Sequence, residues 1–158
     1  METREVLVDT SSILFGFANK RNVFESLGDS MPGYMPVISK GVVRELEKFS
    51  NSRTNRRPGA AAALAYIVNN SKASLGASMV RQDSLPRKMQ PHRKRLGDST
   101  PLKSDIHIDY STEYVDKWIE KRSERTGGAV CTNDIALKRR LRNAGVVVVS
   151  IARSGRIR

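Results

Sequence analysis

Three short segments of this chain are apolar at consecutive positions rather than at alternating ones. They are residues 5–9 (EVLVD), 129–132 (AVCT) and 146–152 (VVVVSIA), and helical patterns lie between them. Strands without polar alternation are typical of parallel sheets, because helices cover both faces of such a sheet. We therefore predict an α/β fold of three layers, with a central, mainly parallel sheet of four to five strands flanked by helices.

The remaining elements are predicted from hydrophobic periodicity and from capping residues. Ser39 and Ser111 are predicted helix caps, while Gly127 and Gly145 are predicted stop signals. Proline and glycine predict a loop over 29–36. Further strands are predicted near 77–80 and over 105–110. Helices are predicted over 10–28, 39–50, 60–71, 112–127 and 135–145.

The 158 residues suffice for one domain with its own core, and we expect a single domain over 1–158. Residues 72–104 contain three prolines and the run HRKR, which predict a basic loop or insertion. A short basic tail follows at 153–158.

Several classes of protein are disfavoured by composition. No apolar run approaches the roughly 18 residues of a membrane span, and the N-terminal residues lack the layout of a signal peptide. Cys131 is the single cysteine, so no internal disulfide can form and a cytoplasmic location is expected. With only His92 and His107 beside it, no zinc site is expected, and Cys131 itself is interpreted as a small core residue.

The formal net charge of +12 predicts a polyanionic partner, of which nucleic acid is the usual kind. The charge is uneven, because residues 1–80 carry a net charge of +3 and residues 81–158 carry +9. A basic surface that only aids solubility is the alternative. Aromatic residues make up 6% of the chain, which argues against an extended base-stacking platform.

Carboxylates stand where two predicted strands end. Asp9 follows EVLV, and Asp134 follows AVCTN. The carboxyl ends of parallel strands meet at one edge of a sheet, where ligands bind, so both side chains can face one crevice. Two further acids lie on predicted helices: Glu45 on the helix over 39–50 and Asp116 on the helix over 112–127.

Each of these acids also has an ordinary structural interpretation. Asp134 or Asn133 could cap the helix that follows, and Asp116 could favour a helix dipole. Glu45 could pair with Lys48 on a solvated face. Asp9 is harder to explain, because a charge beside a buried strand is costly without a partner. Acids gathered at one crevice repel one another unless a cation lies among them, and Mg²⁺ or Mn²⁺ prefers such oxygen ligands.

Four sequence runs resemble PIN-domain nucleases: VLVDTSS at 6–12, VISKGVVRELEKF at 37–49, DKWI at 116–119 and VCTNDIALKRRLRNAGVVVVSI at 130–151. RELEKF and LKRRLRNAGV look most like the Fcf-like branch that acts in small-subunit ribosomal RNA processing, and VapC-like PIN proteins are close to it. The resemblance implies a PIN-like, Rossmann-like fold and a Mg²⁺- or Mn²⁺-dependent endoribonuclease.

The resemblance also implies roles for individual residues. Asp9, Glu45, Asp116 and Asp134 would form the acidic metal site and would be catalytic. Ser11, Thr132 and Asn133 would orient the carboxylates or a water molecule by hydrogen bonds. Asp105, Asp109 and Glu113 compete with Asp116 for the third position, and Asp116 is preferred because Ile119 completes D-x-x-I.

Two clusters of basic residues are predicted to hold RNA: Lys138, Arg139 and Arg140 beside Asp134, and Arg93, Lys94 and Arg95 in the insertion. The expected function is endoribonuclease activity on RNA, for example a ribosomal precursor. The alternatives are a VapC-type toxin with an antitoxin partner and an inactive RNA-binding scaffold that serves assembly. A homodimer is expected from the family, and no membrane association is expected.

Overall fold

The computed structural model of the chain describes residues 4–71 and 105–158. Its five strands form one sheet in the order β3-β2-β1-β4-β5, and all neighbouring strands pair in parallel. The predicted parallel α/β architecture is therefore confirmed. The strands are β1 (Arg4–Val8), β2 (Tyr34–Ser39), β3 (His107–Asp109), β4 (Ala129–Cys131) and β5 (Val148–Val149).

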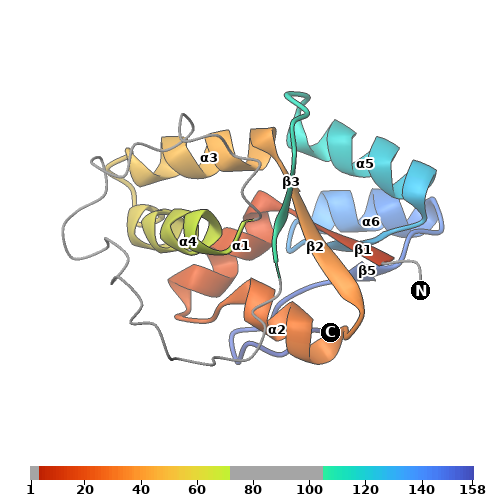
Figure 1. Ribbon diagram of the computed structural model, residues 1–158, viewed down its shortest axis with the longest axis horizontal. Helices are drawn as coiled ribbons and strands as arrows, with labels where there is room; N and C mark the ends of the chain where they lie inside the picture. The colour runs from red at the N-terminus through yellow and green to blue at the C-terminus, as the bar shows by residue number, and fades with distance from the viewer. Residues whose placement is uncertain (1–3, 72–104) are drawn as a thin grey trace.

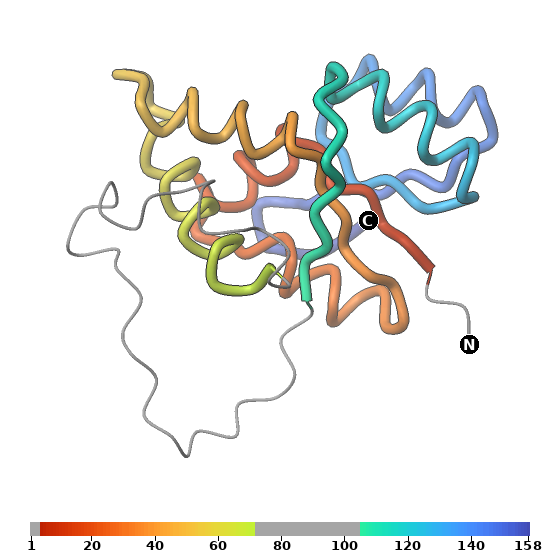
Figure 2. Tube along the Cα trace, turned by 45° about the horizontal axis from the view of Figure 1, so that its top comes forward, coloured from red at the N-terminus to blue at the C-terminus, as the bar shows by residue number. Residues whose placement is uncertain are grey.

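Helices cover the sheet on both sides. Figures 1 and 2 show α1, α3 and α4 grouped on one side of the strands, and α5 and α6 on the other. The central strand β1 is accordingly buried at Val6, Leu7 and Val8. The helices are α1 (Thr10–Ala18), α2 (Val23–Ser30), α3 (Lys40–Ser50), α4 (Arg57–Asn70), α5 (Val115–Thr126) and α6 (Ile135–Asn143).

The single helix predicted over 10–28 is wrong, because the chain turns between α1 and α2. Lys20 adopts a left-handed conformation with φ of 57°, which an α-helix does not accommodate. Asn22 then starts α2 by accepting hydrogen bonds from the backbone N–H groups of Phe24 (3.0 Å) and Glu25 (3.4 Å). The helix also continues past Gly28 to Ser30.

The loop predicted over 29–36 is wrong at its end, because strand β2 begins at Tyr34. The second of its two prolines, Pro36, lies within the strand, at a position opposite Val6 of β1. The Ser39 cap, in contrast, is confirmed: its hydroxyl accepts a hydrogen bond from the backbone N–H of Val42 at 3.2 Å. Strand β2 therefore leads directly into α3, the helix that carries Glu45.

Other boundaries differ from the predicted ones. Helix α4 begins at Arg57, before the predicted 60, because Pro58 is tolerated in a first turn. Ser111 is not the cap of α5. Tyr114 occupies that position without a side-chain hydrogen bond, and the Ser111 hydroxyl accepts from the Glu113 backbone N–H instead. The left-handed Gly127 does end α5, with φ of 64°.

The last strand is shorter than predicted. It is limited to Val148–Val149, and Ser150 exchanges backbone hydrogen bonds of 2.8 and 3.0 Å with Arg158 instead of continuing the parallel ladder. The helix α6 ends as predicted just before the left-handed Gly145. The strand predicted at 77–80 lies outside the described residues.

None of the helices in residues 4–71 and 105–158 has the length and apolar character needed to cross a membrane.

Replacing Ser39 with alanine should lower the free energy of unfolding by about 1 kcal/mol, because the Val42 N–H loses its cap. Ser39 is fully buried, so no water can replace the hydroxyl. Urea denaturation measures the change. Ser30→Ala, at the exposed end of α2, is the matched control and should have little effect. Equal stability of Ser39→Ala and the wild type would contradict the role of the cap.

Candidate active site at the carboxyl edge of the sheet

Asp9 lies directly after β1, at the carboxyl edge of the sheet, and is only 4% exposed. Both side-chain hydroxyls that reach it donate to the same carboxylate oxygen, Oδ2. One comes from Ser11, and the other from Thr132 at 2.7 Å. Among the described residues no side chain donates to Oδ1 and no cation pairs with Asp9. The two hydroxyls therefore hold the carboxylate through one oxygen and leave Oδ1 without a side-chain donor.

The loop after β4 fixes the direction of these hydrogen bonds. The backbone N–H of Asn133 donates to the Ser11 hydroxyl at 3.0 Å, and that of Asp134 donates to the Thr132 hydroxyl at 3.0 Å. A backbone N–H can only donate, so each hydroxyl oxygen accepts there and its own proton is free to point to Asp9. The sequence prediction that Ser11 and Thr132 orient a carboxylate agrees with this arrangement.

Asn133 acts differently from the prediction. Its side chain does not face a carboxylate but bonds the backbone of Ile151, with Nδ2 donating to the carbonyl at 2.9 Å and Oδ1 accepting from the N–H at 3.1 Å. Its part in the site is to fasten the loop after β4 to the C-terminal segment, while its own backbone N–H orients Ser11.

Burial raises the pKa of Asp9, and the nearby negative charge of Asp116 acts in the same direction. The hydrogen bonds from Ser11 and Thr132 oppose this effect without cancelling it. Ionising Asp9 is therefore less favourable in the folded chain than in the unfolded one. An ionised Asp9 would be stabilised by a cation beside it.

Glu45 lies on α3, and its side chain contacts the first residue of α1. Its Oε2 accepts a hydrogen bond from the Thr10 hydroxyl at 2.6 Å. Thr10 is 4% exposed and is the residue next to Asp9, so this bond joins the two acidic positions. The alternative pairing with Lys48 is absent from the described ion pairs. Sequence reasoning did not assign a role to Thr10, although it stands inside the VLVDTSS run.

Asp134 is the N-cap of α6, since its Oδ1 accepts from the Leu137 backbone N–H at 2.8 Å. The predicted role of Asp134 as a helix cap is therefore confirmed. Its side chain is nevertheless exposed, and its backbone N–H contacts the hydroxyls of both Ser11 and Thr132. The cap thus places a second carboxylate beside the hydrogen-bond network of Asp9.

Asp116 lies in the first turn of α5, where it is half-exposed and paired with a cation. Arg140 of α6 bonds Asp116 at 2.7 Å and Glu120 at 2.8 Å. Arg140 was predicted to hold RNA, but in this arrangement it neutralises two acids instead. The negative charge of Asp116 still raises the pKa of Asp9.

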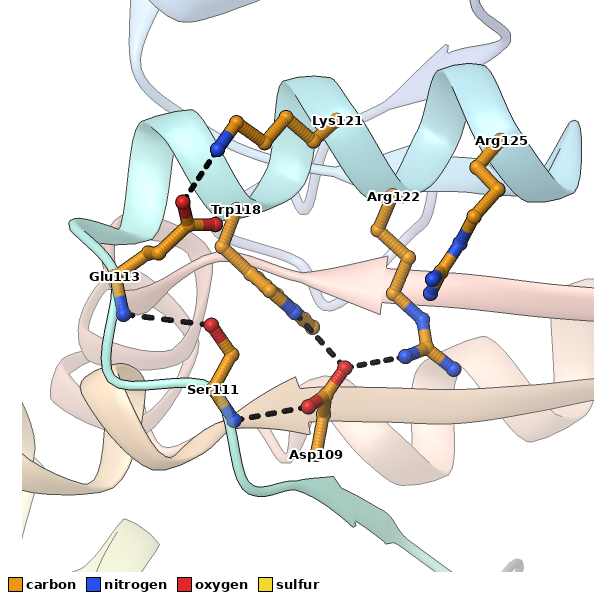
Figure 3. Close-up of a pocket in the computed structure, with 7 residues that line it drawn as sticks. All are labelled: Asp109, Ser111, Glu113, Trp118, Lys121, Arg122 and Arg125. Carbon is orange, nitrogen blue, oxygen red and sulfur yellow. Dashed lines mark hydrogen bonds and ion pairs between the residues drawn. The ribbon is translucent and has the colours of Figure 1, made fainter.

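The competing acids before α5 are engaged elsewhere. Figure 3 shows Asp109, at the end of β3, meeting Trp118 and Arg122 of α5. Trp118 Nε1 donates to Asp109 Oδ2 at 3.1 Å, and Arg122 also binds Glu5 of β1 at 2.7 Å. Burial alone would raise the pKa of Asp109. The hydrogen bond from Trp118 and the contact with Arg122 outweigh burial, so the pKa of Asp109 is lowered.

This network fastens α5 to two strands and is interpreted as structural. Glu113 pairs with Lys121 on the same side, within a pocket of about 410 Å³. Asp105 is exposed before β3.

The predicted RNA-binding residues are placed differently from one another. Lys138 is half-buried and donates to the Ser150 hydroxyl at 3.1 Å, and burial lowers its pKa. Arg139 is exposed and makes no ion pair within the described residues. Arg93, Lys94 and Arg95 lie outside the described residues. Cys131 is fully buried, and burial raises the pKa of its thiol to about 12, as expected of a core residue.

In residues 4–71 and 105–158, no three His, Cys, Asp or Glu side chains are close enough together to hold a metal ion as they stand. The donor chemistry nevertheless fits a hard divalent cation. Asp9 offers an oxygen without a side-chain donor, Asp134 is exposed beside it, and all four predicted acids supply oxygen ligands. The Arg140 partner of Asp116 is the contact that such an ion would have to replace.

Two solved structures share this arrangement of strands and helices. The chain resembles a structure described as the PIN domain endonuclease Utp24, with a TM-score of 0.59 and 24% identity over 98% of this chain and 89% of that one. It also resembles a domain of a functionally unknown protein from Methanocaldococcus jannaschii DSM 2661, with a TM-score of 0.55 and 16% identity over 94% and 91% of the two chains. No protein-family model and no curated protein matches the sequence.

Replacing Asp9 with asparagine should raise the midpoint of thermal unfolding at neutral pH in a metal-free buffer. The raised pKa means that ionising Asp9 costs folded-state stability once the pH exceeds the ordinary value of 3.8, and asparagine removes that cost. The gain should shrink as the pH falls toward that value, because Asp9 is then protonated in both states. Thermal melts over a pH series measure this. An equal or lower midpoint for Asp9→Asn at neutral pH would contradict the raised pKa.

Proposed function

We propose that this chain, which has the fold of a PIN domain endonuclease, is an endoribonuclease that hydrolyses RNA phosphodiester bonds with the help of Mg²⁺ or Mn²⁺. The observation that carries the proposal is Asp9: a buried carboxylate, held by two hydroxyls, with no cation among its described partners. A protein gains no stability from such a group, which favours a functional reason for it.

Each residue has a defined part in this proposal. Ser11 and Thr132 hold Oδ2 of Asp9, so that its other oxygen faces the ligand. Thr10 holds Glu45 in the same way. Asp9, Glu45, Asp116 and Asp134 would hold the metal. A divalent ion bound there activates water and offsets negative charge on the phosphate during in-line displacement.

The surrounding charge supports RNA as the substrate. The chain carries +12, yet acids line the proposed catalytic edge, so the basic residues must hold the polyanion from outside the site. Arg139 is suited to this, since it is exposed and lies on α6, the helix that Asp134 caps. The branch resemblance of RELEKF and LKRRLRNAGV makes a ribosomal precursor the substrate that we propose.

An RNA-binding protein without nuclease activity is the second candidate, and one contact favours it. Arg140 neutralises Asp116 and Glu120 at distances of 2.7 and 2.8 Å, as a site that needs no metal would allow. Cleavage assays separate the two candidates.

Purified wild-type protein should cut RNA with Mn²⁺ or Mg²⁺ and should not cut it with chelator. Asp9→Asn and Asp134→Asn should each lose at least about a hundredfold in rate, because a metal ligand is lost. A panel of structured and single-stranded RNAs with mapped ends measures this. Both variants should still bind RNA as tightly as the wild type, or more tightly, because a negative charge near phosphate has been removed.

Tight RNA binding without cutting by any of these proteins would favour the second candidate. Full cleavage by Asp9→Asn would overturn the proposed site. Asp29→Asn, an exposed acid at the end of α2, is the matched control and should cut like the wild type.

Arg139→Gln should lower the slope of log Kd against log salt by about one, because one phosphate contact is lost. Binding of one RNA over a salt series, in chelator, measures the slope. Arg44→Gln, an exposed arginine on α3, provides the comparison. An unchanged slope for Arg139→Gln would remove that residue from the RNA-binding surface.

A further inference from the structure

A second cavity opens beside Ser11, and none of the four proposed catalytic acids lines it. Its volume is about 400 Å³, which is at the small end of the roughly 300–1,000 Å³ typical of ligand pockets. Leu14, Phe15 and Ala18 of α1 give it an apolar lining. We call it the α1 pocket.

The α1 pocket shares lining residues with the surroundings of Asp9. Ser11 lines it, and the hydroxyl of Ser11 is the group that donates to Asp9. Asn133 lines it as well, with its side chain fixed to the backbone of Ile151 at 2.9 and 3.1 Å. A molecule bound in the pocket would therefore lie next to whatever is bound at Asp9.

The α1 pocket is also lined by polar and positive groups that have few partners. Asn55 is exposed, and its amide makes no hydrogen bond within the described residues. Arg56 stands beside it with no ion pair in the same part of the chain, and its guanidinium lies 5.1 Å from the centre of the Phe49 ring.

Arg56 and Arg57 also sit at the start of α4, where no acid occupies the first turn. Positive side chains at a helix N-terminus are unfavourable, so their placement there is costly to the isolated helix. An anion bound beside the pocket would offset that cost.

We propose that the α1 pocket binds the base of one unpaired RNA nucleotide, next to the phosphate that is cut at Asp9. This inference rests on the proposed function and names its substrate class as single-stranded RNA. The apolar lining suits the face of a base, Asn55 can bond a base edge through both its donor and its acceptor, and Arg56 can meet a flanking phosphate. A base that is paired in a duplex cannot enter such a pocket.

Two substitutions test the pocket without touching the acids. Asn55→Ala removes the polar contact, and Ala18→Leu fills the cavity with a side chain that offers no ring for stacking. Asn143→Ala and Ala144→Leu, at the exposed end of α6, are matched controls. All are made in the full-length Asp9→Asn protein and tested in chelator, so that RNA is bound but not cut. Thermal melts verify that each variant is folded.

The probes are short single-stranded RNAs of each base and a duplex of mixed sequence. Ala18→Leu should weaken binding of single strands about tenfold, as loss of a base contact does, and should leave duplex binding unchanged. Asn55→Ala should reduce the differences in affinity among the four bases. If both variants bind every single strand as tightly as the controls do, the inference is overturned.

Cleavage by the same substitutions in the wild-type background keeps the two proposals apart. Failure of the wild type to cut any RNA, together with the binding differences above, would remove the proposed function and leave the pocket as a base-binding site. Normal cutting with unchanged cleavage positions in Asn55→Ala and Ala18→Leu would keep the function and overturn the pocket.

Discussion

The organisation of this edge of the sheet depends on the hydrogen bonds that converge on one oxygen of Asp9. Thr132, after β4, is 123 residues away in sequence, yet its hydroxyl is 2.7 Å from Asp9 Oδ2. Parallel pairing of β1 and β4 brings the two together, since Val8 stands opposite Cys131 in the register. The backbone of the Asn133–Asp134 loop then fixes which way each hydroxyl points. A buried acid is thereby given an orientation, but residues 4–71 and 105–158 supply it with no counter-charge.

In the proposed enzyme, this unbalanced charge would set the stability of the folded chain against metal binding. Burial raises the pKa of Asp9, and Asp116 raises it further, so the folded chain by itself disfavours the very ionisation that a metal ligand requires. Arg140 offsets part of this repulsion by pairing with Asp116 and Glu120. In the proposed enzyme the metal would take over this role, and Arg140 would be released to meet RNA.

Much of this arrangement could be predicted from the sequence, because two rules of parallel sheets apply to it directly. The apolar runs before Asp9 and Asp134 identified β1 and β4, and the common carboxyl edge predicted that their terminal residues would meet. The strand β2 was missed because Pro36 and the turn residues before it predict a loop. The break at Lys20 was missed because a left-handed lysine has no signature in the sequence.

The contacts that set the charge of the site could not be predicted. Arg140 lies 24 residues from Asp116, and their pairing depends on how α5 and α6 pack on the sheet. The same holds for Thr10, whose bond to Glu45 spans two helices. Local patterns identify which residues are acidic or basic, whereas tertiary packing decides which of them remain unpaired.

The central claim is that Asp9 binds a divalent metal ion. The most direct test is to locate the ion that the protein binds. Crystals of the full chain soaked in Mn²⁺ would be measured at a wavelength at which manganese scatters anomalously. A metal site at Asp9 predicts an anomalous peak in contact with its carboxylate, lost in crystals of Asp9→Asn. A peak at Asp9 in neither protein, or Mn²⁺ bound only at other acids such as Asp109 and Glu113, would contradict it.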